Sequence, residues 1–227
     1  MNAPPHPLRL DIRDHHPLEA FAIIVDINNF ARMVSEAVDG WSKGEFIAQF
    51  TRDTLAGAIE AIECNDGEVV GIMGDAIFGV VGRDHSIYQV CAAIAERVNQ
   101  ESRRISEHQH KSPMDWDYSP GGASLKICVE FGWMGVTTIT TRQLGTQHML
   151  IGPAINYASR IGQAGRGNRC LIGPVAARVG DFVTQVLDGP HRVAGKEGEG
   201  ELQFYELALE NLWRTGPVVA GEPTYVE

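Results

Sequence analysis

The stretches 22–30, AIIVDINNF, and 69–82, VVGIMGDAIFGVVG, decide how this chain folds. Each is an apolar strand pattern interrupted by one acidic residue, Asp26 in the first and Asp75 in the second. An ionised carboxylate beside so many apolar side chains is unfavourable unless a positive charge lies next to it. If the two carboxylates meet in space, they form an oxygen-rich site for a divalent cation, and Mg²⁺ or Mn²⁺ suits such ligands best.

The residues around Asp26 predict a phosphate site next to the metal site. Residues 20–27 read as a buried strand, and Asn28 and Asn29 are suitable helix N-caps before Phe30. A strand that runs directly into a helix leaves free backbone N–H groups beside Asp26. These groups can bind a phosphate or another anion.

The rest of the chain indicates a mixed fold. Two apolar runs flank Gly74 and Asp75, which predicts a tight β-hairpin with Asp75 at its tip. The remaining patterns predict helices over 44–64, 85–105 and 152–163, a surface loop over 107–122, a strand over 124–133 and an extended arm over 137–147. This order predicts an α+β fold with one sheet and helices on one main face.

The chain is long enough for one sizeable domain. We expect a flexible leader over 1–17, a single domain over 18–208 and a tail over 209–227. Hydrophobic residues make up 44% of the 227 residues, which is enough for a packed core.

Charge and hydropathy exclude several classes of partner. The formal net charge of −10 argues against general binding to nucleic acid or to an anionic membrane. The sequence has no apolar run near the ~20 residues that span a bilayer, and no signal-peptide core. Four widely spaced cysteines predict reduced thiols in the core of a cytoplasmic protein: Cys64, Cys91, Cys128 and Cys170.

Four short motifs follow one another in a specific order. They are D-I-x-x-F from Asp26, M-G-D-A from Met73, G-x-x-x-N-x-A-S-R from Gly152 and V-x-G-K from Val193. Together they resemble the catalytic domain of class III nucleotidyl cyclases, over residues 18–208. The resemblance implies a ferredoxin-like fold, with a central, mainly antiparallel sheet flanked by helices. It also implies a lyase in which the 3′-hydroxyl of a nucleoside triphosphate attacks the α-phosphate and pyrophosphate leaves.

The resemblance assigns roles to the residues near the strand end. It implies that Asp26 and Asp75 hold two divalent ions, Mn²⁺ or Mg²⁺, and that the backbone carbonyl of Ile27 completes one metal shell. The N–H groups from Ile27 through Asn28 and Asn29 to Phe30 would then face the phosphates.

The third motif supplies the other half of the site. The resemblance implies that Asn156 orients the ribose and that Arg160 neutralises charge on the α-phosphate. These residues are four apart on a predicted helix, so they share a face. In the family the two halves come from different subunits of a head-to-tail dimer. This chain carries both halves, so a homodimer with two shared sites is expected.

Three positions depart from the family pattern. Adenylate cyclases typically place Lys, and guanylate cyclases Glu, at the position of Gly71. The second base-reading position, usually Asp, Thr or Cys, is Met149 here. Ala194 stands where a phosphate-contacting Lys is usual, and Lys196 is the candidate substitute.

The departures favour a pyrimidine substrate, because a site selects a base through polar groups that the wrong base leaves unpaired. Short cyclases of this kind resemble the pyrimidine cyclases of bacterial anti-phage (Pycsar) systems. Their product activates a separate effector. The resemblance favours UTP and cyclic UMP, and three alternatives stay open. They are a cytidylate cyclase, an adenylate cyclase with an atypical base pocket, and a degenerate module that only binds nucleotide.

Overall fold

The first strand of the chain, β1 (Pro17–Ile27), lies near the middle of the sheet and has neighbours on both edges. It pairs antiparallel with β3 (Ala76–Gly82) on one side and with β4 (Leu125–Thr141) on the other. The computed structural model of the protein describes residues 17–28, 30, 31, 34, 41–109, 125–142, 145–182, 187–195 and 200–214.

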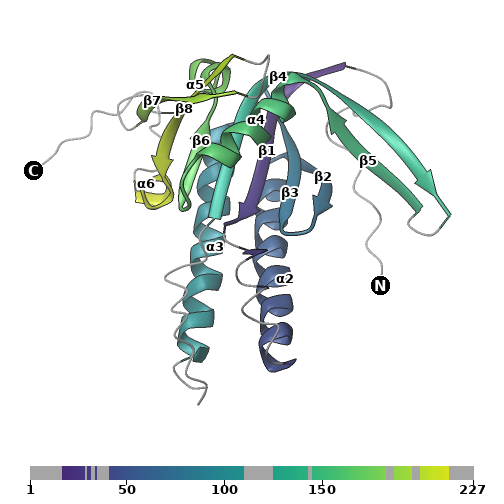
Figure 1. The fold of residues 1–227 in the computed structure, drawn as a ribbon, viewed down its shortest axis with the longest axis vertical. Helices are drawn as coiled ribbons and strands as arrows, with labels where there is room; N and C mark the ends of the chain where they lie inside the picture. The colour runs from purple at the N-terminus through teal and green to yellow at the C-terminus, as the bar shows by residue number, and fades with distance from the viewer. Residues whose placement is uncertain are drawn as a thin grey trace, which may run out of the picture.

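In the described part of the chain the sheet has eight strands, and Figure 1 shows how they are arranged. Its order is β2-β3-β1-β4-β6-β8-β7, with β5 paired to the far end of β4. The remaining strands are β2 (Gly67–Met73), β5 (Gly145–Ile151), β6 (Arg169–Ile172), β7 (Asp188–Ala194) and β8 (Glu201–Ala208). All pairs are antiparallel except β4 with β6, so the predicted mainly antiparallel α+β fold is confirmed.

Helices cover both faces of the sheet. Figure 1 shows α4 on the near face, while the long helices α2 and α3 run behind the sheet and extend past its edge. The helices whose bounds lie within the described residues are α2 (Trp41–Cys64), α3 (Ile87–Gln109), α4 (Pro153–Ala164), α5 (Pro174–Val179) and α6 (Leu209–Arg214).

The expectation of helices on one main face is therefore wrong, and β1 gives the physical reason. Phe21 and Ile23 are buried in the core cluster that includes α2 and α3, whereas Ala22 and Ile24 are buried against α4. A strand that is apolar at both odd and even positions exposes hydrophobic surface on both faces of the sheet. One layer of helices cannot cover both faces.

Several predicted boundaries also change. The 69–82 hairpin is confirmed as β2 and β3, with Gly74 and Asp75 between them. The predicted strand over 124–133 does not stop before the arm, because β4 continues to Thr141 and β5 then returns along it. Helix α3 runs to Gln109, so the first residues of the expected 107–122 loop are helical, and 110–122 lie outside the described residues.

The structure describes parts of the predicted leader and of the predicted tail. Of the leader over 1–17, only Pro17 is described, and it begins β1. The expected tail begins with α6, in which Leu209 and Leu212 are buried in the core cluster of α2 and α3. The Tyr88 hydroxyl donates a 2.9 Å hydrogen bond to the carbonyl oxygen of Leu212 and so ties α3 to α6.

The cysteines follow the prediction in part. Cys91, Cys128 and Cys170 are buried and Cys64 is exposed, so the last of these is not a core thiol. All four are free thiols. Within the described residues, no helix combines the length and the apolar character needed to cross a membrane.

Candidate active site

Asp26 and Asp75 lie together at one edge of the sheet. Asp26 is the penultimate residue of β1 and is paired in register with Ala76, the residue that follows Asp75. The backbone N–H of Ile27 donates a 3.2 Å hydrogen bond to the carbonyl oxygen of Asp75. The register of β1 with β3 thus brings the two carboxylates, which are far apart in sequence, to one place.

The backbone at the hairpin tip permits this arrangement. Gly74 adopts a φ of 61°, which L-residues rarely adopt, and its missing Cβ would meet no atom within 4 Å. The turn of two residues leaves Asp75 half-buried at the end of β1.

The electrostatics of the pair suit a divalent cation. Burial raises the pKa of the Asp26 carboxyl, the negative charge of Asp75 raises it further, and the positive charge of Lys126 lowers it. Two carboxylates that repel each other at a half-buried site are the donor set that a hard cation such as Mg²⁺ or Mn²⁺ prefers. The residues present therefore fit the predicted metal ions.

The expected phosphate-binding segment is described in part. Ile27 is buried in the core and Asn28 follows it in a turn, while Phe30 is half-buried and packs against the core of α2 and α3. Asn29 lies outside the described residues.

Asn156 and Arg160 lie on α4, as the motif predicts. The helix begins after Gly152, whose φ of 146° and close packing exclude a side chain, because a Cβ there would lie 2.7 Å from the carbonyl oxygen of Trp133. Ala154, Ile155, Ala158 and Ile161 are the buried residues of α4. Asn156 is exposed and Arg160 is half-buried, so both are placed to act at a surface.

Asp26 lies near the C-terminal end of α4. Lys126, the register partner of Asp26, donates a 3.0 Å hydrogen bond from Nζ to the carbonyl oxygen of Gly162 in the last turn. Asn156 is six residues earlier, which is about 9 Å along the helix axis. The aspartate pair and Asn156, the candidate for holding the ribose, are thus offset along α4 within one chain.

The two base-reading positions come from two strands that do not pair with each other, but that approach each other at the edge of the sheet. Gly71 is in β2 and Met149 is in β5, and a Cβ built on Gly71 would lie 3.7 Å from the carbonyl oxygen of His148. Met149 is 43% exposed. Ala194 ends β7, whereas Lys196 lies outside the described residues.

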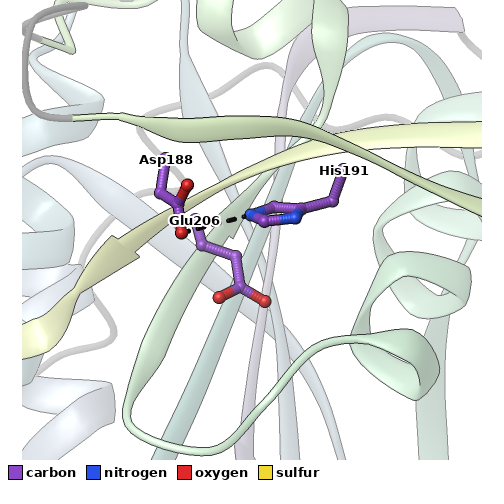
Figure 2. A group of neighbouring side chains, drawn as sticks. All are labelled: Asp188, His191 and Glu206. Carbon is purple, nitrogen blue, oxygen red and sulfur yellow. Dashed lines mark ion pairs between the residues drawn. The ribbon is translucent and has the colours of Figure 1, made fainter.

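A second polar cluster was not predicted from the sequence. Asp188, His191 and Glu206 offer ligand atoms that lie within 4.8 Å of one another, and Figure 2 shows the three side chains. The Nε2 atom of His191 lies 3.4 Å from a carboxylate oxygen of Asp188. The cluster forms because the antiparallel pairing of β7 with β8 puts Asp188 opposite Glu206, which no local pattern reveals.

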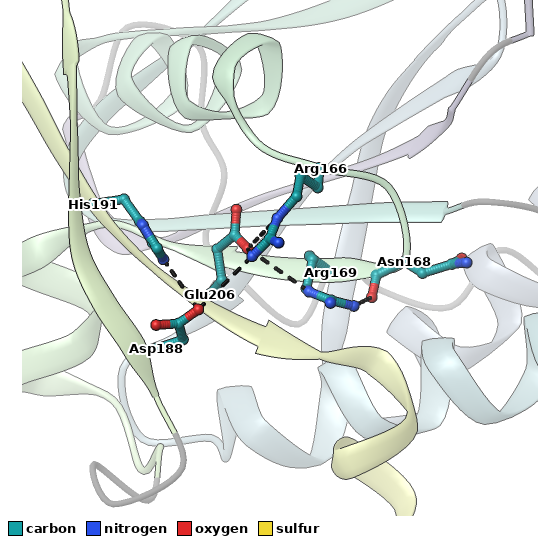
Figure 3. A network of polar contacts seen from close by, with 6 residues as sticks. All are labelled: Arg166, Asn168, Arg169, Asp188, His191 and Glu206. Carbon is teal, nitrogen blue, oxygen red and sulfur yellow. Dashed lines mark hydrogen bonds and ion pairs between the residues drawn. The ribbon is translucent and has the colours of Figure 1, made fainter.

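Two arginines already balance this cluster, as Figure 3 shows. The buried Glu206 carboxylate accepts hydrogen bonds from Nη2 and Nε of Arg166 at 2.6 and 3.1 Å, and Nε of Arg169 lies 3.7 Å away. The two cations match the two carboxylates of Asp188 and Glu206. A metal ion would have to compete with Arg166 for Glu206, so we assign the cluster to stabilisation of β7, β8 and the turn after α4.

Comparison with solved structures identifies the fold. The guanylyl cyclase Cya2 matches with a TM-score of 0.65 and 16% identity, over 86% of this chain and 93% of that one. The adenylyl cyclase CyaB from P. aeruginosa matches with a TM-score of 0.62 and 14% identity, over 85% of this chain and 95% of that one. A class III adenylyl cyclase-like ATP-binding protein from Pseudomonas aeruginosa matches with a TM-score of 0.61 and 16% identity, over 79% of this chain and 39% of that one.

The chain has the class III cyclase fold. No protein-family model and no curated protein sequence matches it. The chain thus shares its fold with these solved structures at a sequence identity of 16% or less.

Proposed function

We propose that this chain is a pyrimidine nucleotide cyclase that converts UTP to 3′,5′-cyclic UMP and pyrophosphate. The observation that carries the proposal is the meeting of Asp26 and Asp75 at the end of β1 in a class III cyclase fold. The two carboxylates and the backbone carbonyl of Ile27 would hold two Mn²⁺ or Mg²⁺ ions. When bound, such ions neutralise phosphate charge and make the 3′-hydroxyl a better nucleophile.

The other residues position the substrate. The backbone N–H groups from Asn28 to Phe30 would bind the phosphates after the end of β1. The N–H of Ile27, which the sequence also predicted for this role, instead donates to the carbonyl oxygen of Asp75. Asn156 would hold the ribose and Arg160 would neutralise the charge that grows on the α-phosphate. An in-line displacement of this kind depends mainly on positioning and charge neutralisation, which these groups supply.

We propose that the active form is a head-to-tail homodimer with two shared sites. Large apolar side chains are exposed on β2 and on the arm formed by β4 and β5, which projects from the sheet in Figure 1. They are Ile72, Met73, Ile139, Met149 and Ile151. Exposed apolar side chains in such numbers favour a protein interface.

The base-reading positions support a pyrimidine. Gly71 has no side chain and Met149 offers no strong hydrogen-bonding group, so the positions that read a purine in the family carry no polar reader here. The resemblance to Pycsar cyclases supports a role in anti-phage defence in the cytoplasm, where cyclic UMP would activate a separate effector.

Specific observations favour two other candidates. The cyclases among the solved structures named above act on purines by their descriptions, which favours an adenylate cyclase with an atypical pocket. The similarity to a cyclase-like ATP-binding protein favours a module that binds nucleotide without turnover. A cytidylate cyclase that makes cyclic CMP is the nearest variant of the main proposal.

A product assay tests the proposal. The purified protein is incubated with ATP, GTP, CTP and UTP, separately and mixed, with Mn²⁺, and the products are identified by mass. We expect cyclic UMP to dominate. Dominant cyclic CMP, AMP or GMP would overturn the choice of base and leave the cyclase assignment intact. No cyclic product from any nucleotide would favour the binding module.

A further inference from the structure

Lys126 lies between α4 and the pair of aspartates, Asp26 and Asp75. The antiparallel register of β1 and β4 puts Lys126 directly opposite Asp26, and side chains of such cross-strand partners lie on the same face of the sheet. On this face, Ala22 and Ile24 of β1 pack against α4. The side chain of Lys126 therefore runs along the face that carries both Asp26 and α4.

The ammonium group of Lys126 is held in a defined place. Its Nζ donates a 3.0 Å hydrogen bond to the carbonyl oxygen of Gly162. This carbonyl is in the last turn of α4, where helix carbonyls lack partners within the helix and a positive charge is favourable. A Cβ on Gly162 would lie 2.9 Å from the Sγ of the buried Cys128, so the glycine allows α4 to pack closely on β4.

The positive charge of Lys126 also acts on the aspartates of the proposed metal site. Directly opposite cross-strand residues have Cβ atoms about 4.5–5.5 Å apart, so the positive charge of Lys126 lies close enough to attract the Asp26 carboxylate. An ammonium and a divalent cation are both attracted to this carboxylate, and they repel each other. The protein thus keeps a monovalent cation beside the site that the proposed function gives to divalent ions.

We propose that Lys126 is a positioning residue for the metal site, and that its fixed ammonium balances Asp26 and Asp75 while lowering their affinity for a divalent cation. This role rests on the proposed function, because it requires that the aspartate pair binds metal. The hydrogen bond to Gly162 explains why the ammonium stays near the site instead of extending into solvent.

A purely structural role makes different predictions. If Lys126 only caps α4, its loss lowers the melting temperature equally with and without metal and leaves metal affinity unchanged. If it balances the aspartate pair, its loss destabilises the metal-free protein most, because Asp26 and Asp75 then repel each other without compensation. Metal binding would also become stronger.

The test uses Mn²⁺ binding, measured from the EPR signal of free Mn²⁺, and melting temperatures in a chelator and in Mn²⁺. The variants are Lys126→Met, Lys126→Gln, which keeps an N–H donor without the charge, and Lys126→Arg, which keeps the charge. Arg97→Met is the matched control, because it removes one positive charge from a surface pair with Glu60 on the helices of the opposite face. Asp75→Asn defines binding at the aspartate pair.

We expect Lys126→Met and Lys126→Gln to bind Mn²⁺ about three- to tenfold more tightly than the wild type. Both should melt at a lower temperature in chelator and recover most of the loss in Mn²⁺. Lys126→Arg and Arg97→Met should bind Mn²⁺ as the wild type does. Unchanged or weaker Mn²⁺ binding by both neutral variants would overturn this role and leave the proposed function intact. Equal Mn²⁺ binding by the wild type and Asp75→Asn would overturn the metal site itself, and with it both proposals.

Discussion

The backbone N–H of Ile27 hydrogen-bonds the carbonyl oxygen of Asp75 at 3.2 Å, which joins the end of β1 to the tip of the β2–β3 hairpin. Because Asp26 immediately precedes Ile27, this one bond holds the two carboxylates near each other. Burial raises the pKa of the Asp26 carboxyl, the negative charge of Asp75 raises it further, and the positive charge of Lys126 opposes both effects. A divalent cation bound between the two carboxylates would remove their repulsion.

Replacing either aspartate should abolish turnover and leave the fold intact. Asp26→Asn and Asp75→Asn each remove one ionised oxygen ligand from the pair, but keep the size of the side chain. Each substitution also removes the repulsion between the carboxylates, so the metal-free variants should melt at a higher temperature than the metal-free wild type. Product mass and thermal unfolding in a chelator measure both effects. Near-normal activity in either variant would contradict the assignment of the metal site.

Replacing Arg160 should slow the chemical step. Arg160→Ala removes a positive charge that faces the α-phosphate, and losing one donor of this kind typically lowers turnover by about 10²–10³-fold. The KM for the nucleotide should change much less than kcat, because the charge develops mainly in the transition state. Steady-state kinetics with the nucleotide identified by the product assay measure the two constants.

Mixing two inactive variants should restore activity if the sites are shared. A heterodimer of Asp75→Asn with Arg160→Ala contains one site in which both the aspartate pair and the arginine are native. The mixture should therefore regain activity that neither variant shows alone, whereas a mixture of Asp75→Asn with Asp26→Asn should not. Failure of the first mixture to recover activity, despite exchange of subunits, would count against the dimer.

Changing the base-reading pair should change the substrate. Gly71→Lys with Met149→Asp introduces the residues that adenylate cyclases use, and a Cβ at position 71 would make only an ordinary contact of 3.7 Å with the carbonyl oxygen of His148. The double variant should lose kcat/KM for the pyrimidine nucleotide and gain it for ATP. The matched control is Gln100→Lys, which adds one positive charge on the exposed side of α3, outside both base-reading strands. An unchanged nucleotide preference in the double variant would show that other residues read the base.

The buried carboxyl of Glu130 should make stability depend on pH. Glu130 is 3% exposed and accepts hydrogen bonds from the backbone N–H groups of Phe131 and Ala176 at 2.7 and 2.8 Å. Burial raises its pKa, although these hydrogen bonds and the charge of Arg178 oppose the shift. The folded state therefore favours the protonated form.

The direction of the pH effect follows from this shift. Glu130 contributes stability below its ordinary pKa and loses that contribution as the pH rises through the raised value. The free energy of unfolding of Glu130→Gln, relative to the wild type, should therefore increase between about pH 4.5 and pH 7. Denaturant unfolding at several pH values measures it, with the exposed Glu201→Gln as the control. A difference that does not change with pH would contradict the burial argument.

Local patterns were sufficient for much of the fold. Gly74 and Asp75 between two apolar runs predict a hairpin, because few other turns join strands so tightly. Gly152 and Pro153 mark the start of α4, which the structure confirms. The order of the strand and helix patterns also predicts an α+β fold with one sheet, and the resemblance to class III cyclases implies that this sheet is mainly antiparallel.

Other features depend on residues that are distant in sequence. The cover of helices on both faces, the length of β4 and the burial of α6 were not predicted. The cluster that contains Asp188 and Glu206 was not predicted either, because only the register of β7 with β8 puts the two side chains together. The same holds for Lys126, whose residue type carries no signal until the register of β4 puts it opposite Asp26.

The sequence by itself determined which groups are available for chemistry: two aspartates in apolar surroundings, an asparagine and an arginine four residues apart, and no polar reader at Gly71 or Met149. Only the tertiary structure decided that Asp26 meets Asp75 and Lys126. The physical reason is that strand pairing is a long-range interaction. Its register is selected by burial on both faces of the sheet, and a shift of one residue would turn Asp26 toward the opposite face.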